Sequence, residues 1–333
     1  MSGKRKQRVL GEPREIKEGI QDATRVLLDR VNEMLVESNG EKVRWRPPWR
    51  SPGHFHSNVL TPWRPYKGPN QVISQLVAEQ KGYDEPRWIT ARAAEKLGGK
   101  VMAGEEPLFL LGFQRVITTR PVLDNDGTWS TTTKLDYRVW QIPVFNVAQC
   151  DGLPEFKRRQ RKVEPWVARQ EGDRVISSMP NPPTITHETG ASPCYSPPFD
   201  HVQMPLREQF NTPGDYYETI FHELAHSTMH PDRLCRKDSS SLAGYATEEL
   251  IAEFGAAHVM NVIGLRATRP IEQPASYLAH WCSVLKREPA ILVACAFAGE
   301  KAGRYILGKE RAESNQGMQE EKGMLPTRER AIA

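Results

Sequence analysis

Apolar residues recur at helical spacing near the start of the chain, between Glu15 and Val36. Spacings of three and four residues place such side chains on one face of a helix. The pattern therefore predicts an amphipathic helix over 15–36, and we expect the polar residues 1–14 before it to be disordered. The prolines of the following stretch, 44–58, predict a loop. The recurring apolar positions are Ile16, Ile20, Ala23, Val26, Leu27, Val31, Met34 and Leu35.

Short helices and then strands follow in the first half of the chain. The pattern predicts helices over 70–80 and 88–97, and Gly98 can end the second of them in the left-handed conformation. The runs 107–119 and 136–147 are rich in β-branched and aromatic residues, which is typical of strands. The polar insert between them has turn chemistry.

Composition changes after Gly152. Residues 154–205 carry nine prolines, and 206–310 are mostly helical by pattern. Within the proline-rich stretch, FDHVQM at 199–204 predicts a short strand, and an extended peptide could pair with such a strand at a sheet edge. We predict a two-domain α+β protein with five segments: a disordered N-terminus (1–14), a small α+β domain (15–153), a proline-rich linker or start of the second domain (154–200), a mostly helical domain (201–310) and a flexible tail (311–333).

Composition and cysteine usage narrow the class of protein. No stretch approaches the ~20 apolar residues that a membrane helix needs, and the basic N-terminus has no apolar run after it. We therefore expect neither a membrane span nor a secretory signal. The five cysteines are widely spaced and form no CxxC pair, which argues against a disulfide framework or a thiolate zinc site. A reducing cytoplasm is the simplest compartment.

Charge and tryptophan are distributed unevenly. Residues 1–163 hold 28 Lys+Arg and 19 Asp+Glu, whereas 164–333 hold 17 and 22, so the net charge of +4 divides into +9 and −5. Seven of the eight tryptophans lie at or before Trp166. A basic region rich in flat aromatic rings suits nucleic acid. A basic surface over an aromatic core has the same composition, so both interpretations stay open at this point.

The motif HELAH at 222–226 has the spacing of a metal site. Residues four apart share one face of a helix, so His222 and His226 can bind one zinc ion together. Glu223 can reach a water molecule on that ion and act as general base. Thr212 as N-cap and Pro213 at the first position predict where this helix begins. Chance produces HExxH in a chain this long about once in a hundred, so a third ligand is needed to support the site.

Three positions could supply that third ligand. His230 lies one turn further on, but eight residues overshoot two turns by ~0.8 residue, which rotates it away from the other histidines. Asp232 stands where a metzincin carries its last ligand, but that class turns the chain with a glycine, and Met229 occupies the turn here. The remaining candidates lie in the segment 247–265.

This segment, TEELIAEFGAAHVMNVIGL, has the signals of a helix that begins at Thr247 and stops at Gly264. Glu249 and Glu253 lie four apart, where two carboxylates repel by a few tenths of a kcal/mol and a cation would reverse that penalty. Glu249 could ligate zinc, and Glu253 could accept the free N–H of a ligating histidine. Glu248 is the weaker candidate ligand. The alternative is that all three glutamates form a solvated face.

Several further motifs run along the chain. Those of the first half are WRPPW (45–49), PYKGPN (65–70), WITARAAEKLGGKVMAGEE (88–106) and VFNVAQCDGL (144–153). Those of the second half are CYSPPFDHVQMP (194–205), HELAHSTMHPDRLCR (222–236), YATEELIAEFGAA (245–257) and YLAHWCSVLKREP (277–289). In these motifs the chain resembles the ArdC-type antirestriction proteins of conjugative plasmids and related mobile elements, over about 15–310. Met229 stands where that family usually has glycine.

The resemblance implies an N-terminal domain that binds single-stranded DNA, shared with TraC-type plasmid primases, and a C-terminal zincin-like metallopeptidase domain. Arginines and lysines would contact phosphates, aromatic rings would stack on bases, and the two asparagines would bond the DNA backbone or the turn itself. Trp49, Tyr66 and Trp88 could instead fill the core of the domain. The candidate DNA-binding residues are Arg44, Trp45, Arg46, Trp49, Arg50, Asn58, Arg64, Tyr66, Lys67, Gly68, Asn70 and Trp88.

The function implied is antirestriction. The protein would bind incoming single-stranded DNA, carry a zinc peptidase site and shield the DNA from host restriction enzymes. Host restriction–modification components are candidate protein substrates. One alternative is a protease that cuts proteins bound or crosslinked to single strands. Another is a replication or primase accessory module in which zinc is structural.

Overall fold

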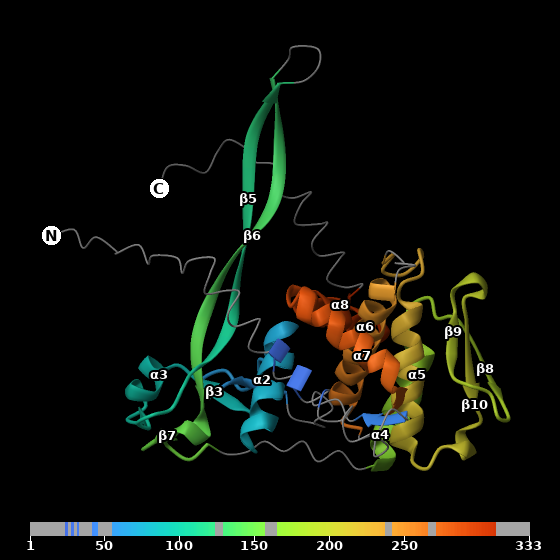
Figure 1. Ribbon diagram of the computed structural model, residues 1–333, viewed down its shortest axis with the longest axis horizontal. Coiled ribbons are helices and arrows are strands. Elements are labelled where there is room, and N and C mark those ends of the chain that lie inside the picture. Colours follow the sequence, from blue (N-terminus) through green and yellow to red (C-terminus); the bar gives the residue numbers. More distant parts are fainter. Residues whose placement is uncertain are drawn as a thin grey trace. The chain divides into compact units, whose positions relative to one another are not determined.

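The chain folds into two compact units, shown in the computed structural model of Figure 1. The structure describes Thr24, Arg25, Leu28, Asp29 and Asn32, and residues 42–45, 55–123, 129–156, 165–236, 242–265 and 271–310. Unit 1 combines the described part of Met1–Leu27 with His56–Phe156, and unit 2 combines that of Leu28–Phe55 with that of Lys157–Ala333. The segments predicted to be disordered, 1–14 and 311–333, lie outside the described residues, as does most of the predicted helix 15–36.

Unit 1 is built on a sheet with the strand order β2-β3-β6-β5. β2 (Ser57–Asn58) runs parallel to β3 (Arg87–Ile89), and the other pairings are antiparallel. β5 (Leu108–Leu123) and β6 (Trp129–Asn146) pair from Leu108 opposite Val144 to Leu123 opposite Trp129, which makes the long green ribbon of Figure 1. Both strands extend beyond the predicted 107–119 and 136–147 into the insert that we assigned to a turn. A second, small sheet pairs β4 (Lys100–Val101) with β7 (Cys150–Asp151).

Helix α2 (Pro69–Lys81) confirms the prediction of a helix over 70–80. It begins with proline at its first position and ends at Gly82, whose φ of 68° is left-handed. Asn70 ties this helix to the sheet, because its amide donates to Leu111 O at 2.7 Å and its Oδ1 accepts from Leu111 N at 2.8 Å.

Helix α3 (Ala91–Lys96) is shorter than the predicted helix over 88–97. Trp88 and Ile89 lie in β3 instead, where both are 0% exposed and belong to the core of unit 1. Burial in a sheet therefore outweighs their local helical spacing. The expected end is confirmed, since Gly98 has a φ of 84°.

Unit 2 has a three-stranded sheet in which β10 (His201–Pro205) lies between β8 (Thr184–Glu188) and β9 (Cys194–Ser196). The prediction of a strand at 199–204 is thus confirmed, but not its position at a sheet edge, because β10 pairs with a neighbour on both sides. β8 and β9 are the edges. The stretch 154–200 is also more than a linker, since it carries α4 (Pro165–Ser178) and these two edge strands.

The helices of unit 2 pack beside this sheet. α5 (Pro213–Ser227) contacts β9 and β10 as well as α6 (Leu242–Ile263), and α6 contacts α8 (Ala290–Ile306) (Figure 1). α7 (Ala275–Arg287) follows β11 (Ile271–Pro274), which pairs with β1 (Lys42–Trp45). The two units therefore confirm the α+β prediction, with a sheet in the first and a mostly helical second. No helix in the described part of the chain is long and apolar enough to cross a bilayer.

Glycines allow α6 and α8 to approach closely. A Cβ atom built at Gly299 would lie 2.4 Å from the Cβ of Phe254 and 2.9 Å from Ile251 O. One at Gly303 would lie 2.8 Å from Gly255 O. The contacted oxygens of Ile251 and Gly255 belong to the backbone, which cannot move away as a flexible side chain can. Glycine at 299 and 303 therefore sets the distance between the two helices.

We expect Gly299→Ala to lower the free energy of unfolding by about 1–3 kcal/mol, because the added methyl group must push α6 and α8 apart. Urea denaturation of the full chain measures this. Lys301→Ala is the control, since Lys301 is exposed on the same helix. Equal denaturation midpoints for Gly299→Ala and the parent protein would contradict this account of the packing.

Candidate metal centre and nucleic-acid interface

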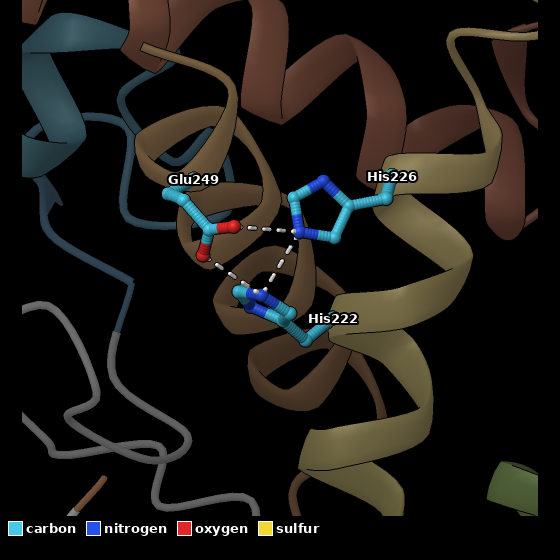
Figure 2. Close-up of side chains that lie close together, drawn as sticks. All are labelled: His222, His226 and Glu249. Carbon is cyan, nitrogen blue, oxygen red and sulfur yellow. Dashed lines mark hydrogen bonds and ion pairs between the residues drawn. The ribbon is translucent and has the colours of Figure 1, made fainter. Parts of the chain in front are cut away.

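Helix α5 presents the two histidines of HELAH from one face. As predicted, Thr212 is its N-cap, with Oγ1 accepting from Asp215 N at 3.2 Å, and Pro213 is its first residue. Figure 2 shows His222 and His226 on successive turns, both directed towards Glu249. Their Nε2 atoms lie 3.1 Å apart.

Glu249 comes from helix α6, on the other side of this gap. Its Oε2 lies 3.4 Å from His222 Nε2, and its Oε1 lies 3.5 Å from His226 Nε2 (Figure 2). An ion bound tetrahedrally at ~2.0–2.2 Å holds its ligand atoms ~3.3–3.5 Å apart. One ligand atom from each of the three side chains lies within 4.8 Å of the other two, so together they are placed to bind one divalent metal ion. They are the one group of His, Cys, Asp or Glu within the described ranges whose ligand atoms converge in this way.

A second carboxylate lies behind each histidine. His222 Nδ1 is 3.4 Å from Glu253 Oε1, and His226 Nδ1 is 3.3 Å from Glu248 Oε1. A carboxylate at Nδ1 fixes the ring and leaves Nε2 to face a metal ion. The structure places Glu253 where the sequence analysis placed it. It places Glu248 behind the second histidine, a position that the analysis did not assign.

Arg236 holds Glu248 in turn. Its Nη2 donates to Glu248 Oε1 at 2.6 Å and to Ala225 O at 3.1 Å. The Nε and Nη1 atoms of Arg236 are buried and have no hydrogen-bond partner among the described residues. Glu248 is therefore the one anion that the described structure offers this guanidinium. The sequence shows no sign of this pair, because no helical spacing connects positions 236 and 248.

The carboxylates control the charge of the histidines. Burial opposes protonation of His226, but its hydrogen bonds to Glu248 and Glu249 prevail and raise its pKa to about 10. Burial likewise opposes ionisation of Glu249, but hydrogen bonds to His222 and His226 hold its pKa well below the usual range. The site is thus built to stabilise positive charge.

Two further groups belong to this centre. Glu223 lies next to His222 on α5 and is 8% exposed. Tyr245 lies one turn before Glu249 on α6 and is 57% exposed. The negative charge of Glu249, burial and a hydrogen bond to Glu249 together raise the pKa of Tyr245 to about 12. The sequence analysis missed Tyr245, although its spacing of four from Glu249 could have indicated it.

The other two candidate third ligands do not join the centre. α5 ends at Ser227, so His230 stands beyond the helix, where its Nδ1 accepts from Asp232 N at 3.3 Å.

Helix α6, which carries Glu249, is longer than the sequence predicted. It begins at Leu242, five residues before the expected start at Thr247, and Gly264 follows its end with a φ of 76°.

The candidate DNA-binding residues have several different environments. Arg64 and Lys67 are exposed, whereas Tyr66 is partly buried and its Oη has no partner within the described part of the chain. Burial raises the pKa of Tyr66. Trp88 is 0% exposed and its Nε1 donates to His56 Nδ1 at 3.0 Å. It has no free ring face for a base, so the expectation that Trp88 contacts DNA is corrected: it is a core residue.

The remaining candidates serve the local fold or belong elsewhere. Asn58 Oδ1 accepts from Leu60 N at 2.8 Å and stabilises a turn, whereas Asn70 ties α2 to Leu111 of β5. Gly68 precedes α2 with a φ of 49°. Three candidates, Arg46, Trp49 and Arg50, lie outside the described residues. Arg44 and Trp45 lie in β1 of unit 2.

Two families match separate parts of the chain. Residues 25–145 match the N-terminal domain of anti-restriction factor ArdC. Residues 178–298 match the zincin-like metallopeptidase family.

Two curated relatives are the DNA primase TraC of Escherichia coli. They are 31% and 32% identical over 300 residues and cover 86% and 85% of this chain. The chain spans only 27% and 20% of their own lengths. Two solved structures of the antirestriction protein ArdC from the R388 plasmid are also similar, one metal-free and one Mn(II)-bound. Both have a TM-score of 0.60, are 25% and 26% identical, and cover 87% of this chain and 98% and 97% of theirs.

We expect Glu248→Gln to weaken binding of Zn(II) and Mn(II) by about 10-fold or more, because groups that orient ligating histidines contribute on that scale. The loss should exceed that of Glu253→Gln, since removing the Glu248 charge leaves the buried Arg236 cation unpaired beside the metal. Competition with a chromogenic chelator measures both affinities. Glu171→Gln, which breaks an exposed ion pair with Arg174, is the control. Parent-like affinity in Glu248→Gln would contradict this role.

Proposed function

The chain is an ArdC-type protein, with an ArdC N-terminal domain ahead of a zincin-like metallopeptidase domain. From this premise we propose that it binds single-stranded DNA, carries a zinc metallopeptidase site and protects incoming DNA from host restriction. The observation that carries the proposal is the convergence of His222, His226 and Glu249 at the spacing of one metal ion, in a chain whose other unit matches the ArdC domain. The similarity to the antirestriction protein ArdC from the R388 plasmid supports protection from restriction as the function.

Zinc is the proposed cofactor, held by the two histidines and Glu249. The zincin-like family and the donor set of two imidazoles and a carboxylate support zinc, and the Mn(II)-bound relative supports a site that accepts other divalent ions. A metal ion bound there would supply a Lewis acid that polarises a peptide carbonyl and acidifies water.

The protein's own side chains would move the protons and orient the substrate. The Glu223 carboxylate accepts a proton from the attacking water and returns it to the departing amine nitrogen. The phenol of Tyr245 would exchange its hydrogen bond to Glu249 for one donated to the substrate carbonyl oxygen as negative charge develops there. The edge strand β9, which pairs only with β10 among the described strands, offers backbone groups to an extended peptide.

The DNA-binding part of the proposal rests on unit 1. Arg64 and Lys67 are exposed there and would contact phosphates, and Tyr66, Asn58, Asn70 and Gly68 shape the loop that carries them. Arg44 and Trp45, with Arg46, Trp49 and Arg50 after them, remain proposed contacts from the chain segment assigned to unit 2. On this proposal the protein has little sequence preference, since phosphate contacts carry no sequence information.

We expect the full chain to bind a single-stranded oligonucleotide more tightly than a duplex of equal length, with affinity that falls steeply as salt rises. Each phosphate neutralised on a single strand contributes a slope of about −0.7 in log K against log salt. Fluorescence anisotropy across a salt series measures both. The intact chain is needed, because the segment Leu28–Phe55 belongs to unit 2 and cutting between the units in sequence would separate β1 from β11. Absence of single-strand binding would refute the proposal.

We expect Glu223→Gln to lower peptide cleavage by about 10²–10⁴-fold while metal and DNA binding persist, because the amide cannot accept the proton. The same variant decides whether cleavage contributes to antirestriction. Plasmid transfer into restricting and non-restricting recipients would be compared for the parent and the variant. Loss of protection would support a proteolytic contribution, and unchanged protection would exclude one.

A second candidate is a protease directed to proteins on single strands. The observation that favours it is that Glu223 and Tyr245 both lie at the metal centre, in a chain that also matches the ArdC N-terminal domain. Added single strands should then accelerate cleavage of a DNA-bound protein but not of a free one. Equal rates would count against this candidate.

A further inference from the structure

The loop between β2 and α2 carries an exposed tryptophan. Trp63 is 70% exposed, whereas Trp88 of the same unit is 0% exposed. Leu60 of the same loop is 50% exposed. The sequence analysis did not select Trp63, because composition shows that the first half of the chain is rich in tryptophan but not which rings face solvent.

Hydrogen bonds at its base make this loop rigid. Tyr66 N donates to His56 O at 2.8 Å, and Pro65 forms an isolated bridge with Ser57. Within the loop, Thr61 N donates to Asn58 O at 3.0 Å and Arg64 N donates to Thr61 O at 2.9 Å. Pro62 and Pro65 restrict the backbone on either side of Trp63 and Arg64. The backbone that carries Trp63 is therefore restricted before any ligand arrives, which lowers the entropic cost of binding.

The surroundings of Trp63 are positively charged. Arg64 and Lys67 are exposed, and neither makes an ion pair with any residue that the structure describes. The sequence contains no Asp or Glu between Glu41 and Glu79. An exposed aromatic ring followed closely in sequence by two exposed cations suits a strand that offers both unpaired bases and phosphates.

We propose that Trp63 is a stacking platform for one base of single-stranded DNA, with Arg64 and Lys67 contacting the phosphates beside that base. This inference rests on the proposed function and deepens it, because it names the group that would distinguish single strands from duplex. Bases in a duplex are already stacked and paired, so an indole on the protein surface gains little from them. An unpaired base has a free face for the ring.

The test measures anisotropy with the full chain and labelled oligo(dT), and with a duplex of equal length. Trp63→Ala should weaken single-strand binding by about 5- to 100-fold, while Trp63→Phe should retain most of the affinity because it keeps a ring. Duplex binding should change little. Phe199→Ala is the matched control, since Phe199 is an aromatic residue of unit 2 that is 80% exposed. Because Trp63 is exposed, its variants should melt at the same temperature as the parent protein.

The salt dependence separates stacking from phosphate contact. Arg64→Gln and Lys67→Gln should each reduce the slope of log K against log salt by about 0.7, whereas Trp63→Ala should leave the slope unchanged. Single-strand binding should also quench the fluorescence of the parent more than that of Trp63→Phe.

The two proposals fail in different ways. A parent protein that binds no single strand would refute the proposed function. A parent protein that binds single strands, together with a Trp63→Ala variant of equal affinity, would overturn only the platform. A Trp63→Ala variant that loses duplex and single-strand binding equally would overturn it as well, because stacking on an unpaired base could not explain that loss.

Discussion

The metal centre depends on the packing of α5 against α6, which concentrates negative charge in a small, mostly buried space. Glu248, Glu249 and Glu253 come from α6, and Glu223 comes from α5. Arg236 is paired with one of these four carboxylates and cannot balance the others. The carboxylates favour positive charge between them, which raises the pKa of His226. A divalent cation between the Nε2 atoms and Glu249 would supply that charge, so the helix pair and the ion stabilise each other.

The small residues behind α6 support this arrangement. Gly299 and Gly303 let α8 approach the backbone of α6 at Ile251 and Gly255. α6 is the helix that carries three of the glutamates. Leu224 and Ala225, which are 0% exposed, anchor α5 between the two histidines. The imidazoles and carboxylates therefore extend from two well-packed backbones, which is the condition for ligand atoms to stay within a few tenths of an ångström of their positions.

Local signals in the sequence predicted much of the site. HELAH, the cap at Thr212 and the i, i+4 glutamates are each encoded within a few residues, and the structure brings them together as expected. The role of Glu248 could not be predicted in this way. Adjacent residues on a helix point about 100° apart, so the assignment of Glu248 to one histidine and Glu249 to the metal position depends on how α6 is rotated against α5. Similarly, the helical spacing of 88–97 gave no sign that Trp88 and Ile89 complete a sheet.

The charge asymmetry of the sequence shows the same limit. When the sequence is divided near residue 163, the first part has a net charge of +9 and the second a net charge of −5. The folded units do not follow that division. Counted by unit, residues 1–27 and 56–156 hold 18 basic and 15 acidic residues, a net +3, and the others hold 27 and 26, a net +1. Overall charge therefore gives neither unit a strong attraction for DNA. Screening limits such attraction to about 8 Å at physiological salt, so local groups decide it. The acid-free segment around Trp63, Arg64 and Lys67 supplies such a local patch, and its exposed ring adds a contact that salt does not screen.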